Sequence, residues 1–345
     1  MTSCQTHISA EDLFERLSKV NVDSPSCRYS LERCRAIAPF INRIRELKAE
    51  KNAIILAHTY VHPDIIYGVA DAVGDSYGLA HVARKTKADV IVFPSVRFMA
   101  DTAKILNPEK MVIDPNPNGG CSLADSITEE KVVELRKQYP DHTFVCYINT
   151  TAAVKAECDV CVTSSNVYRI LEHLPTDKIY FLPDRLMGEN VSKWLHSRGV
   201  QKEILFYPGT CYVHEEFSAE EVDAIRQQYT DAIVIAHPEC KPEVVAKADH
   251  VGSTTDMQRF VAESNETRRP FLLLTECGVA SRISVEIPTA RLIGGCSLCK
   301  YMRSNSLSAI LQALEKPKPH QIIEIASDIQ QRAYRTLERM FEYAK

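Results

Sequence analysis

Short apolar runs rich in β-branched residues alternate along the chain with segments of helical periodicity. This alternation is typical of βα units with parallel sheets and argues against a helical bundle or a β-sandwich. The predicted strands span residues 52–60, 89–98, 110–114, 143–149, 159–165, 178–183, 203–207, 231–237, 250–253 and 270–275. The predicted helices span residues 10–17, 30–48, 76–85, 129–138, 219–228, 242–248, 304–314 and 319–344.

A weak internal repeat divides these elements into three groups. The first strands of the groups end 89 and 90 residues apart, near Tyr60, Asn149 and Glu239. The second predicted strands end near Phe98, Ser164 and Ser253, and only the later interval, 89 residues, matches that period. One cysteine follows each group, with spacings of 90 and 88 residues, at Cys121, Cys211 and Cys299. A period near 90 residues predicts three similar α/β domains.

We therefore expect an α/β protein with three similar three-layer α/β/α domains, each built on a short parallel sheet. The domains are expected at residues 52–120, 121–210 and 211–303. Residues 1–51 are expected to form helices that pack on the first domain, and residues 304–345 to form helices that return to it. Packing about a pseudo-threefold axis would make the three single cysteines converge.

Polar side chains gather where the predicted strands end, which is where ligands bind in open α/β sheets. The first strands end in His58 and Tyr60, in Tyr147 and Asn149, and in His237 and Glu239. Hydroxyl residues such as Ser164, Ser165, Ser253 and Thr254 follow second strands. Such turns place oxygens and N–H groups at helix N-termini, where simple capping explains any one of them. Three hydroxyl-bearing turns on one face favour a site for a carboxylate or phosphate.

Composition excludes several classes of protein. A hydrophobic content of 45% with 25% charged residues is that of an ordinary globular protein, and the net charge of −4 argues against a nucleic-acid-binding surface. No apolar stretch approaches the roughly 18 residues of a membrane span, and the N-terminal sequence lacks the pattern of a secretory signal. We expect a cytoplasmic protein without membrane or nucleic-acid partners. Neither a P-loop nor a GxGxxG motif supports nucleotide binding.

Twelve cysteines are more than a cytoplasmic chain needs. Reduced thiols in such a protein are candidates for metal ligands or reactive groups, although about two-thirds of them are expected to be small buried hydrophobes. The CxxC pair of Cys296 and Cys299 leaves zinc, a redox pair and coincidence open. Cys158 and Cys161 lie within a predicted strand, where a chelating turn does not fit.

Cys121 and Cys211 stand beside glycines in turns that follow an α/β unit. Three single thiolates, one from each domain, suit an iron–sulfur cluster or zinc. A four-iron cluster with three protein ligands would leave one iron open as a Lewis acid.

Ten motifs resemble, in order, those of the A-type quinolinate synthases of NAD biosynthesis, between about residues 53 and 315. They are AHTYVHPD, GDSYGLA, VRFMADTAKILNPEK, CYINTTAAVKAECDVCVTSSN, FLPDRLMG, GTCYVHEEF, AHPEC, ADHVGSTTDM, TECGVASR and CSLCKYM. The resemblance implies three stacked α/β domains around a central 4Fe–4S cluster. It also implies the condensation of iminoaspartate with dihydroxyacetone phosphate to quinolinate, with release of phosphate and two waters.

By the same resemblance the cluster ligands are Cys121, Cys211 and Cys299. Cys299 is preferred to Cys296 because the family's ligand directly precedes an aromatic-Met segment, here KYM. Many relatives carry CxxCxxC at this place, whereas this chain has only the final CxxC. A thiol switch would therefore be confined to a Cys296–Cys299 pair.

The resemblance also implies the residues around the substrate. They are His58, Tyr60, Ser76, Tyr147, Asn149, Ser164, His237, Glu239, Ser253 and Thr254. Ser/Thr turns at helix N-termini suit the carboxylates of quinolinate and its precursors. The candidates for proton transfer are Tyr60, Tyr147, His237 and Glu239, with the division between acids and bases left open.

Several alternatives stay open at this level. Ser165 could replace Ser164, and His214 is a weaker candidate because some relatives place a histidine where this chain has Tyr212. Charged residues within the motifs, such as Lys104, Glu276 and Arg282, could instead form ion pairs at domain interfaces.

Iminoaspartate hydrolyses readily, so an aspartate oxidase or aspartate dehydrogenase is a plausible supplying partner. An iron-sensing or redox-sensing protein would need the three cysteines but not the strand-end residues. A zinc-dependent hydrolase or aldolase is the third alternative.

Overall fold

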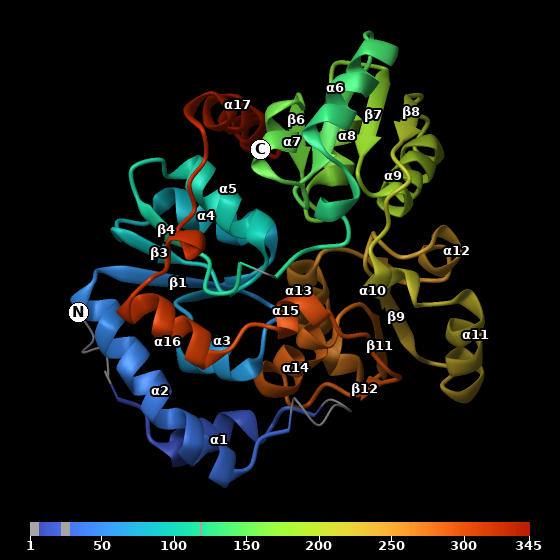
Figure 1. Ribbon diagram of the computed structural model, residues 1–345. Coiled ribbons are helices and arrows are strands. Elements are labelled where there is room, and N and C mark those ends of the chain that lie inside the picture. Colours follow the sequence, from blue (N-terminus) through green and yellow to red (C-terminus); the bar gives the residue numbers. More distant parts are fainter. Residues whose placement is uncertain (1–6, 22–27, 118) are drawn as a thin grey trace.

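The computed structural model describes residues 7–21, 28–117 and 119–345 and contains three four-stranded parallel sheets (Figure 1). The first sheet has the order β2-β1-β3-β4, with strands Ala72–Gly74, Ala53–His58, Val90–Val92 and Met111–Ile113. The second has the order β6-β5-β7-β8, with Val160–Val162, Thr143–Tyr147, Lys178–Leu182 and Glu203–Phe206. The third has the order β10-β9-β11-β12, with His250–Val251, Ile233–Ala236, Phe271–Leu274 and Leu292–Ile293.

Helices connect the strands and flank the sheets. In the first unit they are α3 Pro63–Gly68, α4 Ser76–Lys85 and α5 Arg97–Leu106. In the second they are η2 Ala124–Ser126, α6 Glu129–Gln138, α7 Ala152–Ala156, α8 Val167–His173 and α9 Arg185–Ser197. In the third they are α10 Tyr212–Glu215, α11 Ala219–Gln228, α12 Pro242–Val245, α13 Thr254–Ser264, η3 Asn265–Thr267, α14 Cys277–Glu286 and α15 Lys300–Arg303. The repeated architecture confirms the predicted α/β class with three similar units.

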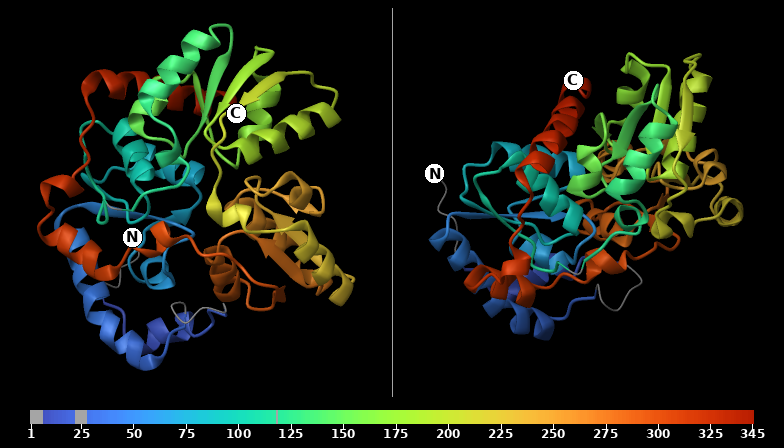
Figure 2. Two further views of the ribbon diagram at one scale, coloured as in Figure 1. Left: turned by 45° about the vertical axis from the view of Figure 1, so that its right-hand side comes forward. Right: turned by 45° about the horizontal axis from the view of Figure 1, so that its top comes forward.

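The identical strand order has a direct consequence for ligand binding. In each sheet the second strand pairs with one edge of the first strand and the third strand pairs with its other edge. This reversal of direction creates a topological switch point next to the first strand. Ligands bind outside the carboxyl ends of the strands at such points. Figure 2 shows the three units grouped around a common centre. The strand-end residues singled out above therefore stand at three equivalent switch points.

One predicted strand was too long and was taken for the second strand of its unit, and its correction completes the repeat. The segment 89–98 forms only β3, because Pro94 has no N–H to donate to the ladder and α5 begins at Arg97. The true second strand of the first unit is β2, a three-residue strand whose sequence, AVG, carries no recognisable apolar run. Strands β2, β6 and β10 end 88 and 89 residues apart, at Gly74, Val162 and Val251.

Helices at the two ends of the chain cover the outside of this assembly. They are α1 Ala10–Leu17, α2 Leu31–Glu50, α16 Leu307–Glu315, η4 Pro319–Gln321 and α17 Ser327–Tyr343. Helix α2 packs on α1 and α16, and Ile322 bridges to Ile113 of β4. Helix α17, by contrast, lies mainly against α7 and β6 of the second unit and also touches α5 (Figure 2). Parts of the predicted N-terminal segment, residues 1–6 and 22–27, lie outside the described residues.

Several helix boundaries follow from capping residues visible in the sequence. Ser9, Asp75 and Ser218 each accept a backbone N–H from the first turn of α1, α4 and α11, respectively. The apolar faces of α1 and α4 contribute to a core that runs through all three units, whereas α11 packs on a smaller core within the third unit. Among the described helices, none combines the length and apolar character needed to cross a lipid bilayer.

Candidate functional site

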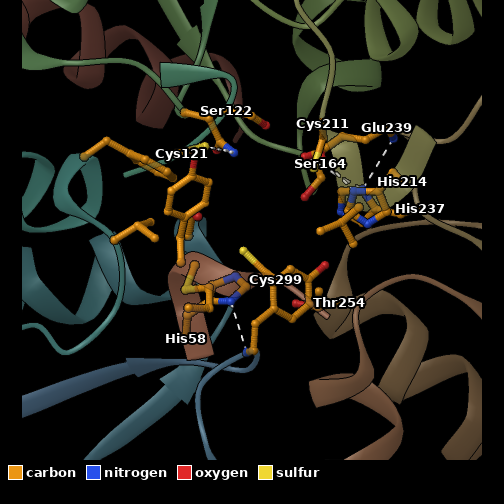
Figure 3. A pocket seen from close by; sticks show the side chains of 18 of the residues that line it. His58, Cys121, Ser122, Ser164, Cys211, His214, His237, Glu239, Thr254 and Cys299 are labelled. Atoms are coloured by element: carbon orange, nitrogen blue, oxygen red, sulfur yellow. Dashed lines mark hydrogen bonds and ion pairs between the residues drawn. The ribbon is translucent and has the colours of Figure 1, made fainter. Parts of the chain in front are cut away.

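The three units enclose one cavity of about 640 Å³, counted with the space at its mouth. It lies at the carboxyl ends of the first strands, and side chains from all three units point into it (Figure 3). Of the predicted site residues, all except Ser253 line this cavity. They are His58, Tyr60, Ser76, Cys121, Tyr147, Asn149, Ser164, Cys211, His237, Glu239, Thr254 and Cys299.

His58 and His237 occupy equivalent places in the first and third units, at the end of β1 and directly after β9. The Nδ1 atom of His58 accepts the backbone N–H of Tyr60 at 3.2 Å, and that of His237 accepts the N–H of Glu239 at 3.4 Å. A neutral imidazole that accepts through Nδ1 carries its proton on Nε2. Burial lowers the pKa of His58 to about 4 and that of His237 to about 3. Near neutral pH both rings are therefore uncharged N–H donors.

A chain of hydrogen bonds joins two tyrosines from different units through Glu239. The Tyr147 hydroxyl lies 2.5 Å from Oε1 of Glu239, and Nδ1 of His214 lies 2.8 Å from Oε2. On its other side His214 Nε2 lies 3.0 Å from Oγ1 of Thr275, which in turn lies 2.8 Å from the hydroxyl of Tyr60. The path therefore runs from the second unit through the third to the first.

Burial and hydrogen bonding set the protonation of Glu239 and of the two tyrosines in this chain. Burial by itself would raise the pKa of Glu239, but the neighbouring His214 and His237 and the hydrogen bonds from His214 and Tyr147 outweigh it and lower the pKa. Burial raises the pKa values of Tyr60 and Tyr147 well above 10, so both phenols keep their protons. A Glu239 carboxylate then accepts hydrogen bonds from Tyr147 and from Nδ1 of His214, and Thr275 is hydrogen-bonded to both Nε2 of His214 and the hydroxyl of Tyr60.

His214 and Thr275 are the residues that sequence reasoning underrated or missed. His214 is only 2% exposed and stacks on His237 with 4.4 Å between ring centroids. The spacing Cys-x-x-His from Cys211 was a signal for it, since one helical turn places both side chains on the same side. Thr275 follows β11 and opens the motif TECGVASR, but nothing in that motif assigned it a role in the site.

Turns after the second strands supply hydroxyl groups to the same cavity. Asp75 caps α4 and its Oδ2 accepts hydrogen bonds from Ser165 at 2.6 Å and Ser253 at 3.1 Å. Ser165 and Ser253 therefore tie the second and third units to the first. Ser164, its neighbour, lines the cavity instead. The buried Oγ1 of Thr254 also lies in the cavity wall and has no hydrogen-bond partner among the described residues.

A repeated backbone hydrogen bond places the three predicted cluster ligands. In each unit the first residue of the helix after the third strand donates its N–H to the carbonyl two residues before the cysteine. The pairs are Arg97 to Gly119 at 3.2 Å, Arg185 to Gly209 at 2.9 Å and Cys277 to Ser297 at 2.9 Å. Cys121, Cys211 and Cys299 therefore come to the cavity by the same local geometry, once from each unit.

The chemistry of these donors fits a soft metal centre. Burial raises the pKa of the Cys121 thiol to about 12 and also raises the pKa values of Cys211 and Cys299. Thiols in such surroundings become thiolates when a metal binds. Three sulfur atoms from three units in one cavity form a set of soft ligands that suits an iron–sulfur cluster or zinc.

A second set of metal-type ligands overlaps with this one. Single ligand atoms of Cys211, His214 and Glu239 lie within 4.8 Å of one another. His214 and Glu239 are already bonded to each other, so a cation there would have to displace that hydrogen bond. A metal held by the three cysteines would not have to displace the hydrogen bond between His214 and Glu239.

The sequence left open whether Cys296 pairs with Cys299, and in the structure Cys296 instead forms a disulfide with Cys277. A parallel bridge between Glu276 and Ser297 brings the end of β11 beside the chain that follows β12, with a Cα–Cα distance of 5.1 Å between the two cysteines. Cys299 lies beyond this bridge and lines the cavity. Other described cysteines are buried thiols, as expected for most of them: Cys34, Cys146, Cys158, Cys161 and Cys240.

Comparison with known proteins agrees with this arrangement. The model of the family described as Quinolinate synthetase A protein matches residues 42–342. Quinolinate synthase of Agrobacterium fabrum is 42% identical over 335 residues, which cover 97% of this chain and 92% of that protein. Quinolinate synthase of Xylella fastidiosa is 44% identical over 300 residues, covering 87% of this chain and 86% of its own.

Similarity extends to a distant bacterium. Quinolinate synthase of Aquifex aeolicus is 42% identical over 306 residues, covering 87% of this chain and 92% of that protein. The matched segments include every strand of the three sheets and all residues that line the cavity. This chain belongs to the quinolinate synthetase A family.

Proposed function

We propose that this chain is a quinolinate synthase of NAD biosynthesis. It condenses iminoaspartate with dihydroxyacetone phosphate to quinolinate and releases phosphate and two waters. The observation that carries the proposal is the single cavity in which twelve predicted site residues, drawn from three units, come together. Family membership supports the same activity.

Cys121, Cys211 and Cys299 would hold a 4Fe–4S cluster. When bound, the cluster would supply a Lewis-acidic iron for the substrate. The donor chemistry supports this assignment, because each cysteine is reached by the same backbone hydrogen bond and none of the three is used in a disulfide. Asn149 lies near this position and directs its Nδ2 toward the Cys121 sulfur at 3.9 Å.

The substrate carboxylates would be held by neutral donors. Among the described residues that line the cavity, none is a lysine or an arginine. Hydroxyl groups of Ser76, Ser164 and Thr254 stand near the start of helices, where the helix dipole favours negative charge. The Nε2–H groups of His58 and His237 would add two donors. The unpartnered Oγ1 of Thr254 supports a ligand at this place.

Proton transfer would use the chain between Tyr147 and Tyr60. Imine rearrangement and dehydration require groups that accept and return protons within hydrogen-bond reach. Glu239 would act as the base, because its low pKa keeps it ionised and it touches the Tyr147 hydroxyl. His214 and Thr275 would connect Glu239 to Tyr60, so that a proton taken up at one tyrosine can be returned at the other.

An anaerobic assay tests the proposal directly. The protein is reconstituted with iron and sulfide and given dihydroxyacetone phosphate and iminoaspartate generated in place by an aspartate oxidase, and quinolinate is measured by chromatography. We expect quinolinate from the native protein and none from Cys211→Ala. Cys240→Ala, which alters a buried thiol outside the cavity wall, serves as the matched control and should remain active.

Two other results would replace the proposal. Four irons per chain without quinolinate would support the sensor alternative. Zinc without iron, with no visible absorption after anaerobic purification, would support a zinc-dependent hydrolase or aldolase. An aspartate oxidase or dehydrogenase remains the proposed supplier of iminoaspartate, since this substrate must be made close to the point of use.

A further inference from the structure

The Cys299 segment cannot be held in place by its own secondary structure. Cys299 is the N-cap residue of α15, and its side chain makes no capping hydrogen bond. Helix α15 has four residues, far fewer than an isolated helix needs to be stable in water. Its position must therefore come from contacts with other parts of the fold.

Glu276 supplies the central contact. Its carboxylate is completely buried and forms a two-point ion pair with Arg303, from Nε to Oε1 at 2.9 Å and from Nη2 to Oε2 at 3.3 Å. The same Oε1 lies 3.4 Å from the backbone N–H of Cys299, and Oε2 accepts the N–H of Gly278 at 2.6 Å. One carboxylate thus binds the first and last residues of the segment that carries the cysteine.

Arg303 extends this anchor to the first unit. It donates to the carbonyl of Val61 at 3.4 Å, and its own carbonyl lies 2.9 Å from Nε2 of His62. The Arg303 side chain is 9% exposed, so the ion pair is shielded from solvent. Fork-shaped pairing of a guanidinium with a carboxylate fixes direction as well as distance. The pair consequently sets Cys299 relative to both the first and third units.

In the first and second units, the residue equivalent to Glu276, directly before the helix that follows the third strand, does not contact the cysteine of its unit. Val96 precedes α5 and forms no side-chain capping bond, while Asp184 binds only the first turn of α9 through Met187. Cys121 instead has a local partner, because its N–H is bound by Asp125 at 3.2 Å, four residues along the chain. Only the third unit, within the described residues, uses a distant buried ion pair for this purpose.

We propose that Glu276, acting with Arg303, is the positioning residue that presents Cys299 to the metal centre. The proposal rests on the proposed function in that Cys299 is taken as a cluster ligand. Glu276 does not touch the cavity itself, and its effect passes through the backbone of Cys299 and through α15.

The test uses full-length protein and two separate readouts. In cofactor-free protein, alkylation of Cys299 by iodoacetamide is measured by peptide mass spectrometry against Cys211 in the same molecule. In reconstituted protein, the loss of iron to a chelator is followed by visible absorption. Glu276→Gln is compared with Glu286→Gln, which removes an exposed ion pair with Arg282 on the same helix.

We expect Glu276→Gln to speed iron loss by about tenfold or more, the range seen when outer partners of metal ligands are removed. The ratio of Cys299 to Cys211 alkylation should change by a similar factor, and Glu286→Gln should match the native protein in both readouts. Native rates in Glu276→Gln would overturn the proposal. The alkylation ratio needs no cofactor, so it decides the role of Glu276 even if the native protein binds no cluster.

A double variant separates positioning from general instability. Glu276→Gln alone leaves a buried guanidinium without its partner, which can destabilise the whole protein. Glu276→Gln with Arg303→Met removes both charges and the two-point anchor while keeping side-chain volume similar. Fast iron loss and an altered alkylation ratio in a double variant with native thermal stability would support the proposal. Recovery of native rates in that variant would overturn it.

Discussion

The Tyr147 hydroxyl lies 2.5 Å from Oε1 of Glu239, and the two residues come from different sheets of the molecule. Tyr147 ends β5 of the second unit, and Glu239 follows β9 of the third. Both side chains are almost fully buried. The proposed proton-transfer pair therefore exists only when the two units are assembled in register.

Glu239→Gln should abolish most turnover while leaving the cluster in place. An amide cannot accept a proton, and it must also give up at least one of the hydrogen bonds that the carboxylate accepts from Tyr147 and His214. Loss of a general base costs about a hundredfold or more in rate. Steady-state assays together with iron content test this, and a fully active Glu239→Gln would remove Glu239 from the mechanism.

Cys296→Ala should keep its iron, whereas Cys299→Ala should lose iron and activity together. Cys296 is already bonded to Cys277, so its sulfur is not needed as a ligand. Loss of this disulfide should lower the free energy of unfolding by about 2–4 kcal/mol in oxidising buffer. Thermal unfolding with and without a reductant checks this loss of stability. Once the native disulfide is reduced, the native protein and Cys296→Ala should unfold at the same temperature. Iron loss from Cys296→Ala alone would reverse the assignment.

Gly209→Ala should displace Cys211 and destabilise the fold. A Cβ atom at this position would lie 2.6 Å from the carbonyl oxygen of Pro183, which is backbone and cannot move aside freely. We expect a loss of about 1–3 kcal/mol in unfolding free energy, as for overpacked sites, and a fall in iron content. Gly74→Ala, where an added Cβ meets no atom within 4 Å, is the control for stability. Equal stability of the two variants would contradict the close packing.

Asp114→Asn should stabilise the protein at pH 8 but not at pH 4. Asp114 is fully buried, and burial raises its pKa from 3.8 to about 7. Between those values the unfolded chain releases the proton that the native state keeps, so native stability falls as pH rises. The loss is complete above pH 7 and amounts to at most about 4 kcal/mol. Asn stays neutral throughout and avoids this loss.

Thermal unfolding of both proteins across this pH range measures the effect. The melting temperature of Asp114→Asn relative to the native protein should rise from pH 4 to pH 7 and then level off. A constant difference across the range would show that Asp114 ionises normally in the folded protein. The second oxygen, Oδ2, has no hydrogen-bond partner among the described residues, which is why the amide is a fair substitute.

The sequence predicted most of the elements because their signals are local. Helices α1, α4, α6 and α11 begin and end at the predicted residues, where capping side chains and apolar periodicity coincide. Strands β2 and β12 were missed, since their sequences, AVG and LI, are too short and stand in no longer apolar run. The strand predicted at 89–98 was too long because its apolar residues continue beyond Pro94 into α5.

The site residues show the same difference between those with a local signal in the sequence and those defined by tertiary contacts. The motifs and the 90-residue spacing were enough to nominate Cys121, Cys211 and Cys299, and the other candidates were nominated because they lie where predicted strands end. Thr275 had no such signal: its role in the hydrogen-bond chain comes from His214 and Tyr60, which reach it from other parts of the fold.

By itself, the sequence determined the α/β class, the three-fold repetition and the family, since these depend on periodicity and on ordered motifs within single units. Only the tertiary structure decided which side chains meet. The Tyr147–Glu239 bond, the Cys277–Cys296 disulfide and the Glu276–Arg303 pair join residues 92, 19 and 27 positions apart. Such pairings depend on how the chain folds back within a unit and on how the units pack together, and a local pattern of side chains does not specify either.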